Sequence, residues 1–194
     1  MIRRTQAERS DATTAALVCA ARNLFGTNGY AKTSIDAIAA VAGVTKGAAY
    51  HHFGGKMELF RAVFVREQEE LAAKLEQAAS EESDAWTALR RGARTFLEYC
   101  LDPRFRQIVL LDAPSLMGWE RAREIEHDHT LRVLLAGLRL AAGDDADDKL
   151  PARAQLIFGT LCEAGMLLAR SADPAADLPR LAADVDRFLE AHRS

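Results

Sequence analysis

The sequence predicts an all-α protein, with an N-terminal three-helix domain that contains a helix-turn-helix and a C-terminal helical bundle, about nine helices in all. Apolar residues recur at intervals of three and four along nearly the whole chain, and no segment alternates as a strand does. Glycine or proline separates the periodic segments. The 194 residues, 49% of them hydrophobic, can bury a sizeable core as one domain or two small ones.

The first predicted helix runs from about Ala7 to Gly26, and Gly29-Tyr30 follows it. Its inner stripe consists of Leu17, Ala20, Ala21, Leu24 and Phe25. This stripe predicts that the helix packs against the elements that come after it.

A second helix is predicted from a capping box. The Thr33 hydroxyl is placed to accept from the Asp36 amide, and the Asp36 carboxylate to accept from the Thr33 amide. The helix therefore begins at about Ser34. Its apolar face consists of Ile35, Ile38, Ala39 and Ala42. Gly43 ends it, because glycine tolerates the left-handed conformation that closes many helices.

A third helix follows after a tight turn. Thr45 is placed to cap it, and it runs from Lys46 to His52 before a Gly-Gly pair ends it. Two short helices joined by a turn with glycine are typical of the helix-turn-helix, whose second helix enters the major groove. The motif covers about residues 33–53. The alternative is a small helical hairpin in an ordinary core, with a solvated lysine and two surface histidines.

The residue types of the third helix suit contact with DNA. Lys46 is a donor for guanine or phosphate, and Gly47 and Ala48 are small enough to approach base edges. Tyr50 and the two histidines after it offer donors to phosphates. With residues at helix N-termini, where phosphate is attracted, the predicted contact set is Thr33, Ser34, Thr45, Lys46, Gly47, Ala48, Tyr50, His51, His52 and Lys56.

Charge is distributed unevenly along the chain. The net charge is −3, but residues 1–56 hold seven Lys+Arg and three Asp+Glu, whereas residues 57–194 hold eighteen and twenty-five. The basic excess lies where the helix-turn-helix is predicted, as phosphate contact requires. We therefore expect a DNA-binding domain over 1–56 and a second domain over 57–194. Arg3, Arg4 and Arg9 are expected to form an arm on DNA, or else a disordered terminus.

Four runs of residues carry a resemblance to a known family: Thr33-Ser34-Ile35-Asp36-x-Ile38-Ala39, Ala42-Gly43-Val44-Thr45-Lys46-Gly47, Tyr50-His51-His52-Phe53 and Lys56-x-Glu58-Leu59. They resemble the DNA-binding domain of the TetR family of transcriptional regulators. Ala48-Ala49 and Gly54-Gly55 depart from its usual pattern. The resemblance implies a homodimeric regulator, most often a repressor, that a small-molecule effector releases from a palindromic DNA operator. The alternative is a helical-bundle ligand- or metal-binding protein that does not read DNA.

The rest of the chain is predicted to be helical. The expected helices cover about Lys56–Ala79, Asp84–Leu101, Asp102–Pro114, Gly118–Ala142, Pro151–Arg170 and Leu178–His192, with an acidic loop over Gly143–Asp148. The second half of the Lys56–Ala79 helix is rich in charged residues, so we expect it to be more exposed than the first half.

The last two helices are the expected dimer surface, because the resembled family dimerises through its last two helices as a four-helix bundle. The residues predicted for this interface are Leu156, Gly159, Leu161, Ala164, Leu168, Leu181, Val185, Phe188 and Leu189. The alternative is that these side chains cover the core of their own protomer.

The resemblance also implies an effector pocket in the C-terminal domain. The candidate lining residues are Trp86, Arg94, Phe96, Tyr99, Phe105, Trp119, His127, Cys162, Glu163 and Met166. The aromatic residues favour an apolar or amphipathic small molecule. The alternative is that the aromatic residues are ordinary core.

A catalytic or metal-binding role is not expected. Glu124-x-x-His127 has the spacing that metal sites use in helical bundles, but the sequence holds no matching second copy. Phosphate-binding loops, nucleophile elbows and CxxC pairs are also lacking. Cys19, Cys100 and Cys162 are interpreted as reduced, mostly buried thiols of a cytoplasmic protein. No apolar run is long enough to predict a membrane span. We therefore expect no enzyme activity, cofactor, metal or membrane partner.

Overall fold

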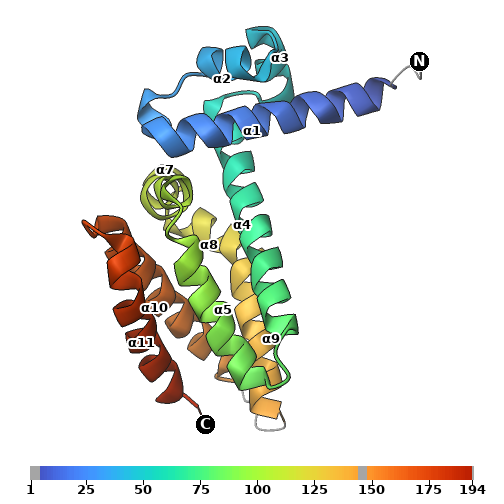
Figure 1. Cartoon of the computed structure of the whole chain (residues 1–194). Coiled ribbons are helices and arrows are strands. Elements are labelled where there is room, and N and C mark those ends of the chain that lie inside the picture. Colours follow the sequence, from blue (N-terminus) through green and yellow to red (C-terminus); the bar gives the residue numbers. More distant parts are fainter. Residues whose placement is uncertain (1–4, 144–147, 194) are drawn as a thin grey trace.

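The computed structural model describes residues 5–143 and 148–193, and these residues form helices without any strand. In Figure 1, α1 crosses one end of the molecule with α2 and α3 beside it, and α4 runs from there along the whole bundle. The elements are α1 (Gln6–Lys32), α2 (Ile35–Ala42), α3 (Lys46–Phe53), α4 (Lys56–Ser80), α5 (Ala85–Tyr99), α6 (Pro103–Phe105), the π-helical segment η1 (Arg106–Asp112), α7 (Ala113–Met117), α8 (Trp119–Asp128), α9 (Thr130–Ala142), α10 (Leu150–Arg170) and α11 (Pro174–Glu190). The predicted fold class is confirmed.

Aromatic packing joins the N-terminal helices to the start of α4. Phe25 and Phe60 are fully buried, with their ring centroids 5.3 Å apart and edge to face. The Tyr30 ring completes the cluster, 5.6 Å from Phe25 and 5.3 Å from Phe60. Such contacts add specific geometry to apolar burial. The first turns of α4 therefore belong to the same packed unit as α1–α3.

α1 is longer than predicted and contains a break. It extends to Lys32, and Gly29 inside it has φ 76° and ψ 163°, a conformation that favours glycine. The break frees the Tyr30 amide, which donates to Asp112 Oδ2 at 2.9 Å. Gln107 donates to the other oxygen of Asp112. The bend in α1 is thus fixed against the C-terminal bundle.

The second half of α4 is more buried than predicted. Leu71 and Leu75 pack in the core, and the polar residues Glu67 and Gln68 beside them are also buried. In Figure 1, α5 and α9 lie alongside this half of α4. The charge-rich sequence predicted that this half of α4 is exposed. That prediction is wrong at Glu67 and Gln68, which are buried with polar partners on neighbouring helices.

Several helix boundaries differ from the prediction. Pro114 does not end its helix, because it lies in the first turn of α7, where a missing amide is tolerated. The expected Gly118–Ala142 helix is interrupted at His129, whose φ and ψ are −121° and −92°. α11 begins at Pro174 and continues through Pro179. The interruption at His129 has the largest consequence, because α8 and α9 are separate helices and α9 packs on α4 and α5.

Some predictions fall at the edge of the described residues. Arg3, Arg4 and residues 144–147 of the acidic loop lie outside them. Arg9 is part of α1 and not of a preceding arm. Of the three cysteines predicted to be mostly buried, Cys100 is buried, Cys162 is half-buried and Cys19 is exposed. Among the described residues, no helix combines the length and apolarity that crossing a bilayer demands.

Candidate nucleic-acid interface and effector cavity

The α2–α3 unit has helix-turn-helix geometry. Ser34 Oγ accepts from the Ala37 amide at 3.1 Å and caps α2, and Thr45 Oγ1 accepts from the Ala48 amide at 3.1 Å and caps α3. Gly43 joins the helices in the left-handed conformation, with φ 68°. Local side chain-to-backbone bonds therefore set both helix starts.

The predicted capping box is absent, and Thr33 is not a surface residue. The Thr33 side chain is buried, and its hydroxyl donates to the carbonyl oxygens of Gly29, at 2.9 Å, and Leu24, at 3.2 Å. The N-cap is Ser34 instead. Thr33 is therefore removed from the predicted DNA contacts. The cap lies one residue later than expected because Thr33 is buried, with its hydroxyl bonded to Gly29 at the break in α1.

The exposed face of α3 carries four of the other nine predicted contact residues. Lys46, Gly47 and His51 are exposed, and Tyr50 is 45% exposed. Ala49 is buried on the opposite face, which anchors the helix. The polar and small side chains thus share one outward surface, as a recognition helix requires.

Two predicted phosphate contacts have partners within the protein. His52 Nδ1 lies 3.2 Å from Thr14 Oγ1, which ties α3 to α1. Lys56 Nζ lies 4.0 Å from the centroid of the Tyr30 ring, within range of a cation–π contact. Both side chains are half-buried. They are held beside the exposed α3 surface.

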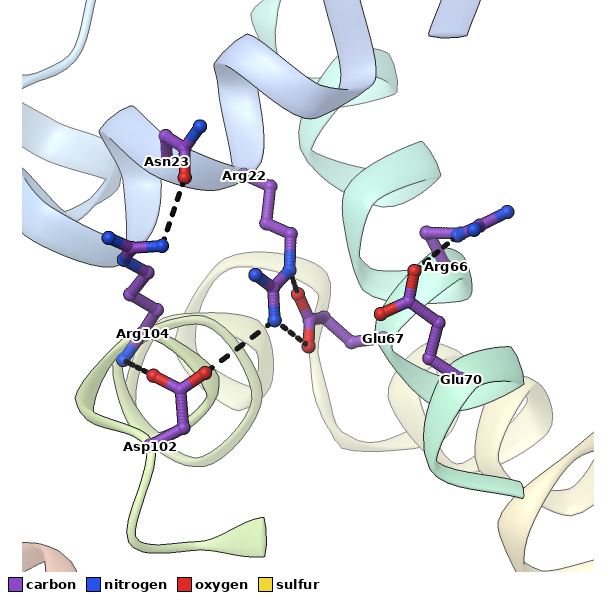
Figure 2. Close-up of polar contacts among 7 residues, drawn as sticks. All are labelled: Arg22, Asn23, Arg66, Glu67, Glu70, Asp102 and Arg104. Carbon is purple, nitrogen blue, oxygen red and sulfur yellow. Dashed lines mark hydrogen bonds and ion pairs between the residues drawn. The ribbon is translucent and has the colours of Figure 1, made fainter. Parts of the chain in front are cut away.

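A charged joint connects the helix-turn-helix unit to the bundle. Arg22 of α1 donates through Nε and Nη2 to the two carboxylate oxygens of Glu67, which is fully buried on α4. Figure 2 shows Arg22 between Glu67 and Asp102, with Arg104 reaching Asn23. The bond to Glu67 raises the pKa of Arg22, so the guanidinium stays charged. Burial raises the pKa of Glu67, and Arg22 opposes that rise.

A cavity of about 530 Å³ lies between α4, α5 and α9, and α10 contributes to its wall. Its apolar wall includes Leu75, Leu89, Phe96, Val133, Leu134 and Phe158. Of the charged residues that line it, Arg132 and Glu76 form an ion pair at 2.9 Å. The size and lining suit a small, largely apolar molecule.

Only Phe96 of the predicted pocket residues lines this cavity. Trp86 donates from its indole nitrogen to Glu190 at 2.8 Å, and Arg94 pairs with Glu98. Trp119 is 65% exposed and stacks on Arg123, and Glu163 is exposed. The remaining predicted residues that do not line the cavity are Tyr99, Phe105, His127, Cys162 and Met166.

The sequence did not indicate this cavity, because α9 supplies one of its walls. The expected long helix gave no reason to place Val133 and Gly137 beside α5. A Cβ on Gly137 would lie 2.8 Å from Leu89 Cδ2, so α9 and α5 approach closely there. Gly92 has no atom within 4 Å of an added Cβ and faces the cavity. The sequence signal that could have indicated the cavity is glycine inside otherwise helical segments, at Gly92 and Gly137.

The candidate metal pair on α8 is solvent-exposed. Glu124 pairs with Arg121, and the His127 ring contacts only Asp128 among the ion pairs of the described residues. No group of three potential His, Cys, Asp or Glu ligands occurs in the described part of the chain.

Burial raises the pKa of Cys162 to about 12, so that thiol stays protonated.

Most residues predicted for the dimer surface lie in the protomer's own core, as the alternative held. These are Leu161, Ala164, Leu168, Leu181, Val185 and Leu189. Phe188 is half-buried against His192. Leu156, by contrast, is 67% exposed, and Gly159 has open space around it. Leu167, which the sequence interpretation missed, is also exposed.

Comparison with known proteins gives the same assignment at both ends of the chain. Residues 17–63 match the family described as "Bacterial regulatory proteins, tetR family", and residues 86–192 match "Tetracyclin repressor-like, C-terminal domain". The HTH-type transcriptional regulator CymR of Pseudomonas putida is 34% identical over 158 residues, covering 76% of this chain and 77% of CymR.

Two further relatives extend the comparison. The Transposon Tn10 TetC protein of Escherichia coli is 32% identical over 64% of this chain, which spans 62% of the length of TetC. The crystal structure of a TetR-family transcriptional regulator from Pectobacterium atrosepticum is 32% identical, covers 97% of both chains and has a TM-score of 0.81. The chain therefore belongs to the TetR family of DNA-binding, helix-turn-helix transcriptional regulators.

Proposed function

We propose that this chain is a homodimeric repressor that binds a palindromic operator and is released from it by a small-molecule effector. The observation that carries the proposal is the exposed face of α3, where Lys46, Gly47, Tyr50 and His51 lie together. This assignment involves no catalytic step, cofactor or metal. Binding to chromosomal DNA would place the protein in the cytoplasm.

We propose that some residues of this surface read bases and that others contact phosphates and so position the protein on DNA. Lys46 reaches a base edge or a phosphate, and Gly47 lets the start of α3 approach the groove closely. Tyr50 and His51 donate to phosphates on the groove walls. Lys56 sits at the N-terminus of α4, which has no side-chain cap, so the amides of its first turn add to the attraction for phosphate.

Dimerisation is proposed to use the outer face of α10 together with α11. Leu156, Gly159, Glu163 and Leu167 recur at intervals of three and four on α10, and none of them is buried in the protomer. A two-fold dimer that reads DNA needs its two α3 helices in successive major grooves, about 34–36 Å apart. Two half-sites then form a palindrome.

The effector is proposed to occupy the cavity between α4, α5 and α9. The wall is largely apolar, and two of its three charged residues, Arg132 and Glu76, are paired with each other, so a neutral, apolar molecule fits the cavity better than an ion. The proposed DNA-binding domain covers 1–56 and the proposed effector and dimerisation domain covers 57–194, with the first turns of α4 packed on the DNA-binding domain. An effector that favours a different placement of α4 lowers operator affinity by its differential affinity for the two states.

The test is selection of bound sequences from a random duplex library, with the affinity of the winning sequence followed against salt. A palindrome with half-sites about one helical turn apart is expected, with affinity that falls steeply as salt rises. Lys46→Ala serves as the binding-defective variant, and it should leave helicity and oligomeric state unchanged. Weak binding without sequence enrichment would contradict the proposal.

A further inference from the structure

Two adjacent polar residues are buried in the middle of α4. Glu67 is 0% exposed and Gln68 is 2% exposed. Buried polar groups are costly unless they are hydrogen-bonded, and a buried charge must be paired. Their partners lie on two other helices, Arg22 on α1 and Thr130 on α9.

Gln68 connects α4 to the wall of the cavity. Thr130 Oγ1 donates to Gln68 Oε1 at 2.8 Å, and both side chains are buried. Thr130 is the first residue of α9, directly after the interruption at His129, and it lines the cavity. Thr130, the residue that holds Gln68, is therefore part of the cavity wall.

Glu67 connects α4 to the DNA-binding helices. Its two carboxylate oxygens accept from Nε and Nη2 of Arg22, and Nη2 also lies 3.7 Å from Asp102 Oδ2 (Figure 2). Asp102 accepts from the amide of Arg104, whose guanidinium donates to Asn23. Arg22 thus links α1 to α4 and to the start of α6 in one arrangement.

We propose that Glu67 and Gln68 act as a relay, through which occupation of the cavity changes the position of the DNA-binding helices. The relay rests on the proposed function and assigns residues to the coupling step. Neighbouring positions on a helix point about 100° apart, so one shift of α4 displaces both side chains from their separate partners. A bidentate guanidinium–carboxylate pair has a narrow geometry, so a displacement of α4 disturbs both of its bonds to Arg22.

The same helix provides a matched control. Arg66 and Glu70 form an ion pair on α4, with Nε 2.6 Å from Oε1, and both are more exposed than Glu67 (Figure 2). This pair lies within one helix and does not connect two helices. Glu70→Gln therefore makes the same chemical change as Glu67→Gln, close by, without touching α1.

The experiment uses a substitution in place of an effector. Gly92 faces the cavity with no atom within 4 Å of an added Cβ, so Gly92→Leu fills part of it from α5. Affinity for the operator selected with the wild-type protein is measured with and without Gly92→Leu, in wild-type, Glu67→Gln, Glu70→Gln and Thr130→Val backgrounds. Fluorescence anisotropy of a labelled duplex gives each dissociation constant.

The relay predicts that cavity filling weakens operator binding by about tenfold in the wild-type and Glu70→Gln backgrounds. In the Glu67→Gln and Thr130→Val backgrounds the same filling should change affinity by less than about threefold. Equal effects in all four backgrounds would overturn the relay, as would no effect of Gly92→Leu on the wild type. Failure of the proposed function would look different, because no operator would then be selected at all.

Folding is checked by helicity and melting temperature for each variant. If Glu67→Gln does not fold, the double variant Arg22→Gln/Glu67→Gln replaces it. The double variant removes both charges of the pair, so neither charge is left buried without its partner. Its expected result is the same loss of response to cavity filling.

Discussion

Lys46 and Asp36 form an ion pair across the helix-turn-helix, with Lys46 Nζ 2.9 Å from Asp36 Oδ1. The first residue of α3 is thereby tied to the first turn of α2, on the surface proposed to meet DNA. The hydrogen bond to Asp36 raises the pKa of Lys46, so the lysine is charged when it approaches a phosphate or a guanine. DNA must compete with Asp36 for this cation.

Asp36→Asn is expected to strengthen DNA binding. The change removes a negative charge beside the phosphates and frees Lys46, so affinity should rise about three- to tenfold for operator and for unrelated duplex alike. The slope of log affinity against log salt should become steeper by up to about one unit. Glu120→Gln, an exposed change on α8, is the control for net charge. Weaker binding by Asp36→Asn would mean that Asp36 orients Lys46 for base contact.

Tyr50→Phe is expected to weaken binding to operator and to unrelated DNA by a similar factor. The ring stays and only the phenolic hydroxyl is lost, which costs about 1 kcal/mol for one hydrogen bond, or roughly fivefold in affinity. Titration of both duplexes at one salt concentration measures this. A loss confined to one base position of the operator would instead show that Tyr50 reads a base directly.

The helix-turn-helix was predictable because its determinants are local. Thr45 and Gly43 act within four residues of their own positions, and the exposed face of α3 follows from helical periodicity. Thr33 was misassigned because its burial depends on the break at Gly29 and on the fit of α1 against the bundle. That information lies in contacts between distant segments.

The bundle was predicted in outline, and its cavity was not. Periodicity identified the helices, but it did not show the interruption at His129 that lets α9 form a cavity wall. It also did not show that Glu67 is buried, because composition marks a glutamate as exposed and only the approach of Arg22 makes its burial tolerable. Pairing across 45 positions of sequence is invisible to local patterns.

Gly26→Ala and Gly92→Ala are expected to change stability in opposite directions. A Cβ on Gly26 would lie 2.5 Å from Arg104 Cβ and 3.0 Å from its Cα, so α1 and α6 would have to separate. We expect a loss of about 1–3 kcal/mol. Gly92 has open space, so alanine there should gain up to about 1 kcal/mol from helix propensity. Urea unfolding measures both, and equal effects would contradict the close approach at Gly26.

Leu156→Glu and Leu167→Glu are expected to dissociate the dimer. Each places a charge in the proposed α10 interface, where burial of a leucine contributes about 1.5–3 kcal/mol, so the dissociation constant should rise at least about tenfold. Light scattering across a dilution series gives the oligomeric state. Leu140→Glu changes another exposed leucine, at the far end of α9, and should leave the dimer intact. Unchanged mass for both α10 variants would move the interface elsewhere.

Glu126→Gln is expected to stabilise the protein at neutral pH and not at acidic pH. The Glu126 side chain is 13% exposed, and burial raises its pKa from 4.5 to about 7, while Arg123 opposes the rise. Between these two values the unfolded chain loses the proton and the folded protein keeps it. The folded state therefore binds more protons there, and the stability of the wild type falls as pH rises through this window.

The size of that fall is at most about 3 kcal/mol, and it levels off above pH of about 7. Glutamine carries no proton to lose, so the variant should exceed the wild type by about 1–3 kcal/mol at pH of about 8 and match it near pH of about 4.5. Urea unfolding across this range is the measurement. Glu124→Gln, an exposed carboxylate paired with Arg121 on the same helix, should show no such pH-dependent gain. A Glu126→Gln gain that stayed constant with pH would mean that the carboxyl group does not titrate in this window, and that its replacement acts through packing.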